Sequence, residues 1–243
     1  MVYGQKFRKG IGPFFISLAE ALSSVLPTPR RKTSGHLALA AKARVLVPNY
    51  RLAPEHPFPA AIDDAVHAYQ WLLDHGSEPS KTVLAGDSAG AGLAISTAIA
   101  LRDWHLPMCA GIVAVSPWAD LTCSGESMTS RATVDIECTR AGLLEMADWY
   151  MSGADPSQPL ASLVFADLAG LPPLLCVVGG DEILLDDSVR LVRNAGTAGI
   201  DATLFIAAGM QHIFPIWAGA FPEADAAIAL VGNWVRRLPF TDH

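Results

Sequence analysis

Short apolar runs alternate with longer amphipathic or alanine-rich stretches along most of the chain. Five of the runs predict buried strands, at 44–47, 81–86, 110–116, 174–179 and 202–207. The neighbouring stretches predict helices that cover 36–43 (the end of one helix), 59–75, 88–104, 184–198 and 223–237. Strands that alternate with helices indicate an α/β protein, with a mostly parallel sheet covered by helices on both faces.

Two parts of the chain depart from this alternation. Residues 117–165, after the third of these strands, hold a polar loop and helical stretches around 140–150. We expect them to form a cap-like insertion above the strand ends, where ligands enter such folds. Residues 14–25 predict a marginal amphipathic helix, and a secretion signal with a cleavage site at 19–21 is the minority alternative. The chain as a whole predicts a single domain with an atypical N-terminal stretch at 1–32.

The strand predicted at 81–86 runs directly into Gly86-Asp87-Ser88-Ala89-Gly90, with no loop before the next helix. This is the G-x-S-x-G pattern, in which a serine occupies a sharp turn between a strand and a helix. The two glycines avoid crowding the strained serine backbone, and the helix brings free N–H groups near the serine oxygen. We therefore predict that Ser88 is a nucleophile and that the Ala89 amide is an oxyanion donor.

A serine hydroxyl is a weak nucleophile and needs a base, which a carboxylate orients. After this kind of turn the chain order is serine, then acid, then histidine. Of the seven histidines, His212 has the right position, on the loop after the strand at 202–207. The others precede the serine, follow it closely or lie at the terminus: His36, His56, His67, His75, His105 and His243.

The acid is predicted to be Asp181, because it follows the strand at 174–179 directly and strand-end loops hold such sites rigidly. Asp186 and Asp187 are the alternatives, although stabilising a helix N-terminus explains both. Glu182 is interpreted as a neighbour without a direct role.

Composition narrows the classes of function. A net charge of −7 argues against nucleic acid or an anionic membrane surface as a partner. Four cysteines without C-x-x-C spacing predict neither a zinc site nor a redox pair, and they favour a cytoplasmic protein. No apolar run reaches the length of a membrane span. We therefore expect a small-molecule ligand, no cofactor and no metal, in a monomer or a homodimer.

Five segments together resemble the bacterial hormone-sensitive-lipase-like carboxylesterases. They are YRLAPEHPFPAA (50–61), GDSAGAGLA (86–94), SPWADLT (116–122), GGDEILLDDS (179–188) and GMQHIF (209–214). The resemblance implies an α/β-hydrolase fold and cofactor-free hydrolysis of carboxylic esters, commonly short-chain ones. It assigns the triad to Ser88, Asp181 and His212. It also suggests an ion-pair network of Arg51 and Glu55 beneath the site, to which a rigid surface turn is the alternative.

Candidates for the substrate pocket are Asp87, Trp118, Trp149 and Phe214, each of which has core or structural packing as its alternative. Two other interpretations of the function also stay open. A peptidase or amidase could use the same fold, and so could a degenerate hydrolase that binds a small apolar ligand.

The family's His-Gly-Gly-Gly segment, whose N–H groups form most of the oxyanion hole, has no counterpart upstream of residue 50. Its expected place by chain count, 15–22, reads FISLAEAL, and the family's N-terminal cap helices and first strands are not recognisable. A shifted reading frame over 15–29 would permit a glycine-rich segment of the family type, which is our hypothesis for the difference. The loss of oxyanion donors predicts an impaired serine esterase.

Overall fold

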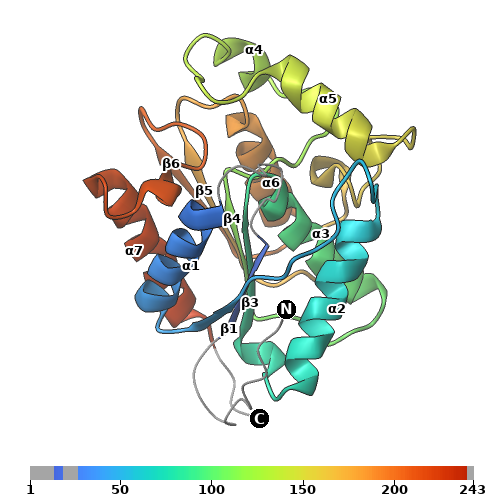
Figure 1. The fold of residues 1–243 in the computed structure, drawn as a ribbon, viewed down its shortest axis with the longest axis vertical. Helices are drawn as coiled ribbons and strands as arrows, with labels where there is room; N and C mark the ends of the chain where they lie inside the picture. The colour runs from blue at the N-terminus through green and yellow to red at the C-terminus, as the bar shows by residue number, and fades with distance from the viewer. Residues whose placement is uncertain (1–13, 19–26, 240–243) are drawn as a thin grey trace.

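Six strands form one parallel sheet in the order β2-β1-β3-β4-β5-β6 within residues 14–18 and 27–239, which are the residues that the computed structural model describes. The strands are β1 (Phe14–Leu18), β2 (Arg44–Leu46), β3 (Thr82–Asp87), β4 (Gly111–Val115), β5 (Leu174–Gly179) and β6 (Ala202–Ala207). Figure 1 shows this sheet at the centre of the molecule with helices around it. The predicted fold class, a parallel sheet flanked by helices, is confirmed.

The helices follow the predicted alternation closely. They are α1 (Pro27–Ala41), α2 (Ala60–Asp74), α3 (Ala89–Asp103), α4 (Ser127–Ser130), α5 (Arg140–Met151), α6 (Leu185–Thr197) and α7 (Pro222–Arg237). None of the helices in the described ranges is long and apolar enough to cross a membrane.

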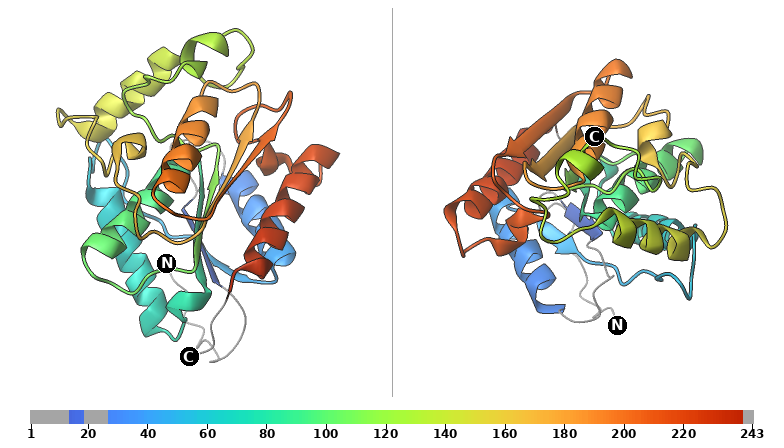
Figure 2. Two further views of the ribbon diagram at one scale, coloured as in Figure 1. Left: turned by 180° about the vertical axis from the view of Figure 1, so that it is seen from behind. Right: turned by 90° about the horizontal axis from the view of Figure 1, so that it is seen from above.

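The helices form two layers, one on each face of the sheet. Helices α1 and α7 pack together on one face, where their apolar side chains form a core with those of β3, β4 and β5. Helices α2, α3 and α6 lie on the other face and form a second core (Figure 2). Helix α3 is buried along most of its length, which its run of small and aliphatic residues allows. The two-layered covering matches what a parallel sheet requires.

Strand β1 corrects the prediction of a helix over 14–25. It lies inside the sheet, paired with β2 on one side and with β3 on the other. A short apolar run in a buried parallel strand has no polar alternation, so periodicity alone does not distinguish it from part of a helix. The rest of the predicted helix and the signal-peptide alternative at 19–21 lie outside the described residues.

The insertion 117–165 contains α4 and α5 and lies above the carboxyl ends of the strands (Figure 1). Below it, the chain leaves β1 through α1 on one face of the sheet and leaves β3 through α3 on the other face. Such a divergence of two neighbouring strands opens a crevice at their carboxyl ends, which is where ligands bind in open α/β sheets. The turn after β3 therefore lies at the position that the fold offers for a site.

Candidate active site

The turn between β3 and α3 holds Ser88 in a strained conformation, with φ 55° and ψ −124°. The turn is tight enough that a Cβ on Gly86 would overlap the backbone carbonyl of Gly90. This is the geometry that the G-x-S-x-G pattern predicts. The Ala89 amide is the first of helix α3, where backbone N–H groups have no acceptor within the helix and can serve an external oxygen.

A hydrogen-bonded chain starts at this serine. The Ser88 Oγ lies 2.9 Å from Nε2 of His212, and the Nδ1 of the same ring lies 2.7 Å from Oε2 of Glu182. Ser88 and His212 are each 5% exposed, and Glu182 is fully buried. The carboxylate fixes the imidazole with its Nδ1 protonated, so that Nε2 faces the serine hydroxyl as an acceptor.

Glu182 lies beside the histidine, in the position that was predicted for Asp181. After β5 the ladder to β6 continues through Gly180, and the Asp181 amide donates to the Met210 carbonyl at 3.0 Å. The chain then turns, and this turn directs residue 182 inward, where its longer side chain reaches the histidine. The prediction of Asp181 as the histidine's partner is therefore corrected, and so is the interpretation of Glu182 as a bystander.

Ser116 extends this chain of hydrogen bonds beyond Glu182, although it was not among the residues predicted for the site. Its hydroxyl donates to Oε1 of Glu182 at 2.8 Å and accepts the Ile213 amide at 3.0 Å, and the Gly179 amide donates to the same Oε1 at 2.6 Å. Ser116 is fully buried and has a φ of 45°, in the left-handed region that costs a residue with a side chain strain energy. Its signal in the sequence is its position as a polar residue at the carboxyl end of the strand predicted at 110–116.

The alternative acids, Asp186 and Asp187, bind backbone amides of the insertion. The Oδ2 of Asp187 accepts the amides of Ala119 and Asp120 at 2.8 and 2.9 Å. Burial raises the pKa of the Asp187 carboxyl to about 8, and the nearby Asp120 carboxylate adds to the rise, whereas the two backbone amides oppose it. Asp186 accepts the amide of Glu126 at 2.5 Å.

Of the stretch 15–22, where chain count places the family's oxyanion segment, the structure describes residues 15–18. Residues 15–18 belong to β1, in which Leu18 lies in register with Gly86 of β3. They are therefore part of the sheet and not a loop over the serine. Residues 19–22 lie outside the described residues. Because Leu18 is the register partner of Gly86, β1 ends two register positions before Ser88.

A pocket of about 80 Å³ opens beside Ala89, on the face of the sheet that α2 and α3 cover. Trp118 and Trp149 line it, as predicted, among mainly apolar neighbours that include Leu93, Met146 and Leu160. The other two candidates do not line it. Phe214 is buried in the core of α1 and α7, and Asp87 borders a smaller cavity on that same opposite face. Both differ from Trp118 because they extend toward the other side of the sheet.

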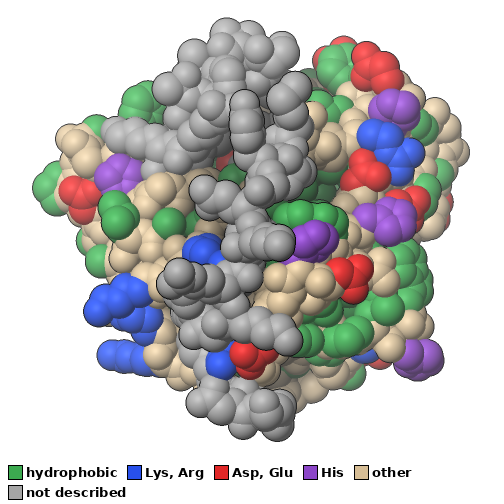
Figure 3. Space-filling view, turned by 60° about the horizontal axis from the view of Figure 1, so that its bottom comes forward, with side chains coloured by type: hydrophobic (Ala, Val, Ile, Leu, Met, Phe, Trp, Pro, Cys, Tyr) green, Lys and Arg blue, Asp and Glu red, His purple; other side chains and the backbone are tan. Residues whose placement is uncertain are grey.

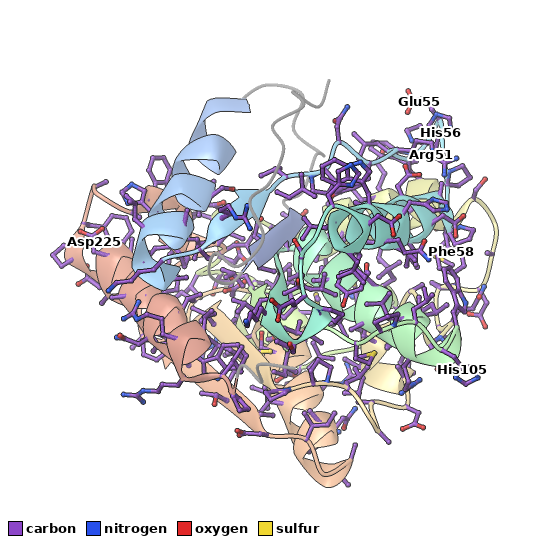
Figure 4. All side chains as sticks on the ribbon, turned by 90° about the horizontal axis from the view of Figure 1, so that it is seen from below. Arg51, Glu55, His56, Phe58, His105 and Asp225 are labelled. Carbon is purple, nitrogen blue, oxygen red and sulfur yellow. The ribbon has the colours of Figure 1, made fainter. Side chains whose placement is uncertain are left out.

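Arg51 forms an ion pair with Asp64 at 2.8 Å and also donates to that carboxylate through its backbone amide and Nε. Arg51 and Glu55 are both exposed. Figure 4 shows them at an outer corner of the molecule. The structure therefore corrects the suggested Arg51–Glu55 network beneath the site, and the alternative of a rigid surface turn describes this segment.

Charged side chains of both signs are mixed on the described part of the surface that Figure 3 presents, without a broad field of one sign. Within the described residues, no group of three or more His, Cys, Asp or Glu side chains is placed to hold a metal ion.

Comparisons with known proteins agree with this geometry. The family model of the alpha/beta hydrolase fold matches residues 23–216. An acetyl-hydrolase of Streptomyces hygroscopicus is 46% identical over 210 residues, which are 86% of this chain and 70% of that protein. An esterase of Acinetobacter venetianus is 36% identical over 206 residues, or 83% of this chain and 67% of that protein.

Solved structures show the same likeness in three dimensions. EstE5 soaked with p-nitrophenyl butyrate is 42% identical, with a TM-score of 0.90. An esterase from the bacterial hormone-sensitive lipase family is 43% identical, also with a TM-score of 0.90. Each match covers 95% of this chain and 78% of the solved one.

Proposed function

Because this chain belongs to the bacterial hormone-sensitive-lipase-like carboxylesterases of the α/β-hydrolase fold, we propose that it cleaves short-chain carboxylic esters through an acyl-serine intermediate. The observation that carries the proposal is the buried chain of hydrogen bonds from Ser88 through His212 to Glu182. Its three groups occupy the roles of nucleophile, general base and orienting carboxylate.

In the first half of the reaction, Oγ of Ser88 attacks the ester carbonyl carbon while Nε2 of His212 takes the hydroxyl proton. The carbonyl oxygen gains the negative charge and accepts a hydrogen bond from the Ala89 amide. Glu182 stays ionised and stabilises the imidazolium that has formed. The bond to the alcohol oxygen then breaks, and His212 returns its proton to the departing alcohol.

In the second half, a water molecule takes the place of the alcohol. His212 removes a proton from the water as its oxygen attacks the acyl carbon, and the proton then passes to Oγ of Ser88 as the acyl bond breaks. The products are a carboxylic acid and the free serine. Both halves need the same ring orientation, which Glu182 sets through Nδ1.

The preference for short acyl groups rests on the pocket beside Ala89. Its volume of about 80 Å³ suits an acetyl or butyryl chain better than a long fatty acyl chain. The apolar lining favours a hydrocarbon group. Because the pocket lies next to the serine turn, it suits the acyl group of an ester whose carbonyl carbon is at Ser88. The EstE5 structure soaked with p-nitrophenyl butyrate suggests the same class of test substrate.

We also propose that the number of oxyanion donors limits the rate. The sequence that follows β1, AEALSSVL at 19–26, contains no glycine, whereas the family's oxyanion segment is glycine-rich. Loss of one donor costs about 10²–10³-fold in kcat in serine hydrolases. If residues 19–26 are replaced by a His-Gly-Gly-Gly-containing segment, kcat for p-nitrophenyl butyrate should rise by at least about 10²-fold. An unchanged kcat would show that the native segment already supplies the donors.

The proposed function is tested with Ser88→Ala and a fluorophosphonate probe. The wild type should hydrolyse p-nitrophenyl acetate and butyrate and become labelled at Ser88, and the variant should do neither while keeping its circular dichroism spectrum. Absence of labelling in the wild type would favour a non-catalytic fold that binds a small apolar ligand. Faster cleavage of aminoacyl amides than of matched esters would favour a peptidase or amidase.

A further inference from the structure

Gln211 links the histidine loop to the insertion above it. Its side-chain Nε2 donates to the Val134 carbonyl at 3.0 Å, and its Oε1 accepts the Ile136 amide at 3.1 Å. The two backbone groups belong to residues two positions apart, so the primary amide pairs with them as a neighbouring peptide group would in a sheet. The residue next to the catalytic histidine is therefore fixed at two points to residues 134–136.

Asp135, in the middle of the same segment, reaches the other loop of the triad. Its Oδ2 accepts the amide of Ile183 at 2.8 Å, directly after Glu182 in the chain. Its Oδ1 accepts the amides of Glu137 and Cys138 at 2.9 and 2.8 Å, which folds the segment back on itself. One carboxylate thus shapes residues 134–138 and ties them to the loop that carries the acid.

Glu137 shows how closely this segment overlies the triad. Partial burial raises the pKa of the Glu137 carboxyl. Of the nearby ionisable groups, His212 lowers this pKa, whereas Asp135 and Glu182 raise it. The segment itself stays at the surface, since Ile136 is 82% exposed. Residues 134–138 therefore form a strap, with one side in solvent and the other against the two loops that hold the histidine and its acid.

We propose that this strap, 134–138, positions His212 and Glu182 for the reaction, with Gln211 and Asp135 as positioning residues. The histidine loop needs such support because Ile213, directly after His212, has a left-handed φ of 48°, which costs a β-branched residue strain energy. Triad groups must be held to about 0.5 Å, and a shift of about 1 Å can cost about 10²-fold in rate. The insertion thereby acts on the chemical step as well as on the entrance to the pocket.

Gln211→Met tests the strap, because methionine keeps a similar length and loses both hydrogen bonds. The role presupposes the ester hydrolysis proposed above, so the assay measures kcat and KM for p-nitrophenyl butyrate and the rate of Ser88 labelling by a fluorophosphonate. We expect kcat and the labelling rate to fall together by about 10-fold or more, with KM within twofold of the wild type. Asp135→Asn should do the same, because its amide NH₂ would face the Ile183 amide, donor against donor.

The insertion also offers matched controls. Asp155 accepts the Ser157 amide at 2.8 Å in a turn like that of Asp135, and Gln158 lies nearby. Asp155→Asn and Gln158→Met should leave kcat within twofold of the wild type. A Gln211→Met enzyme with the kcat of these controls would overturn the proposal, and so would a loss of activity that only tracks its melting temperature.

A second readout separates the strap from the proposed function. His212 donates its Nδ1–H to Oε2 of Glu182, with 2.7 Å between the nitrogen and the oxygen, so this proton should give a far-downfield resonance in the ¹H NMR spectrum. In Gln211→Met this resonance should shift or broaden, whereas in Gln158→Met it should not. An unmoved resonance in Gln211→Met overturns the strap even if the wild type proves to have no esterase activity, in which case only the function fails.

Discussion

Oε2 of Glu182 lies 2.7 Å from Nδ1 of His212, while the neighbouring Asp181 pairs through its backbone amide with Met210. Two consecutive carboxylates thus have different surroundings after the same strand. One is fully buried against the imidazole, and the other is partly exposed on the outer side of the turn. Substitutions of these two carboxylates should therefore have different effects on activity.

Glu182→Gln should lower kcat for p-nitrophenyl butyrate by a factor on the order of 10⁴, because a neutral amide no longer stabilises the imidazolium or fixes the tautomer. Asp181→Asn is the matched control and should keep activity within a few-fold of the wild type. Steady-state kinetics of the two purified variants measure both effects. A larger loss in Asp181→Asn than in Glu182→Gln would contradict the geometry.

Ser116→Ala should lower kcat by about 10-fold, equivalent to about 1.4 kcal/mol, because Glu182 loses a donor and the Ile213 amide loses its acceptor. Ser188→Ala removes another fully buried hydroxyl, one that has no hydrogen-bond partner in the described residues. Its kcat should stay at the wild-type value. Equal losses in the two variants would mean that truncation of a buried serine, and not its hydrogen bonds, causes the effect.

Gly86→Ala should destabilise the fold by about 3 kcal/mol or more, because its Cβ would overlap the Gly90 backbone, which cannot rotate away. Gly35→Ala lies within α1 with open space around the added atom, and it should stabilise the protein by about 0.5–1 kcal/mol. Urea unfolding followed by circular dichroism compares both with the wild type. A Gly86→Ala protein of normal stability would show that the turn can open.

Asp187 should make stability fall as the pH rises. Burial raises its pKa to about 8 in the folded protein from an ordinary value of 3.8, so between these values the folded state holds a proton that the unfolded state has released. The contribution is complete below pH 4 and is lost as the pH rises toward 8. Asp187→Asn should therefore gain in melting temperature relative to the wild type between pH 5 and pH 9. Thermal unfolding of the two proteins across this pH range measures the difference, and a difference that does not change with pH would contradict the prediction.

Local chemistry and chain order were enough to identify Ser88 and His212 as partners. The glycines and the small residues around the serine demand a sharp turn. Of the two histidines after the last predicted strand, His212 lies on the loop that follows it directly and His243 lies at the terminus. The choice between Asp181 and Glu182 was beyond the sequence, because both follow β5 and the direction of each side chain depends on one turn of the backbone. That turn is set by contacts with the histidine loop, which is distant in the chain.

Strand β1 and Ser116 were missed for different reasons. The run at 14–18 is apolar without alternation, and its pairing with β2 and β3 is a long-range event that no local pattern reports. Ser116 did carry a signal, as a polar residue at the carboxyl end of a buried strand, like Ser88. The strap at 134–138 was missed because the side chains of Gln211 and Asp135 bind backbone groups, which every residue carries and which no sequence pattern marks.

The order of the strands fixes how far the last loop must travel. Ser88, Ser116 and Glu182 follow β3, β4 and β5, and His212 follows β6, three inter-strand spacings or roughly 14 Å away from the strand of the serine. The loop from 208 to 213 crosses that width over the end of β5, where Gly179 lies so close to the Met210 carbonyl that no side chain fits. The length of this loop is therefore set by the distance between the end of β6 and Ser88. Removal of one loop residue would leave the imidazole short of the serine. Extra residues in the insertion could instead project outward without changing this distance.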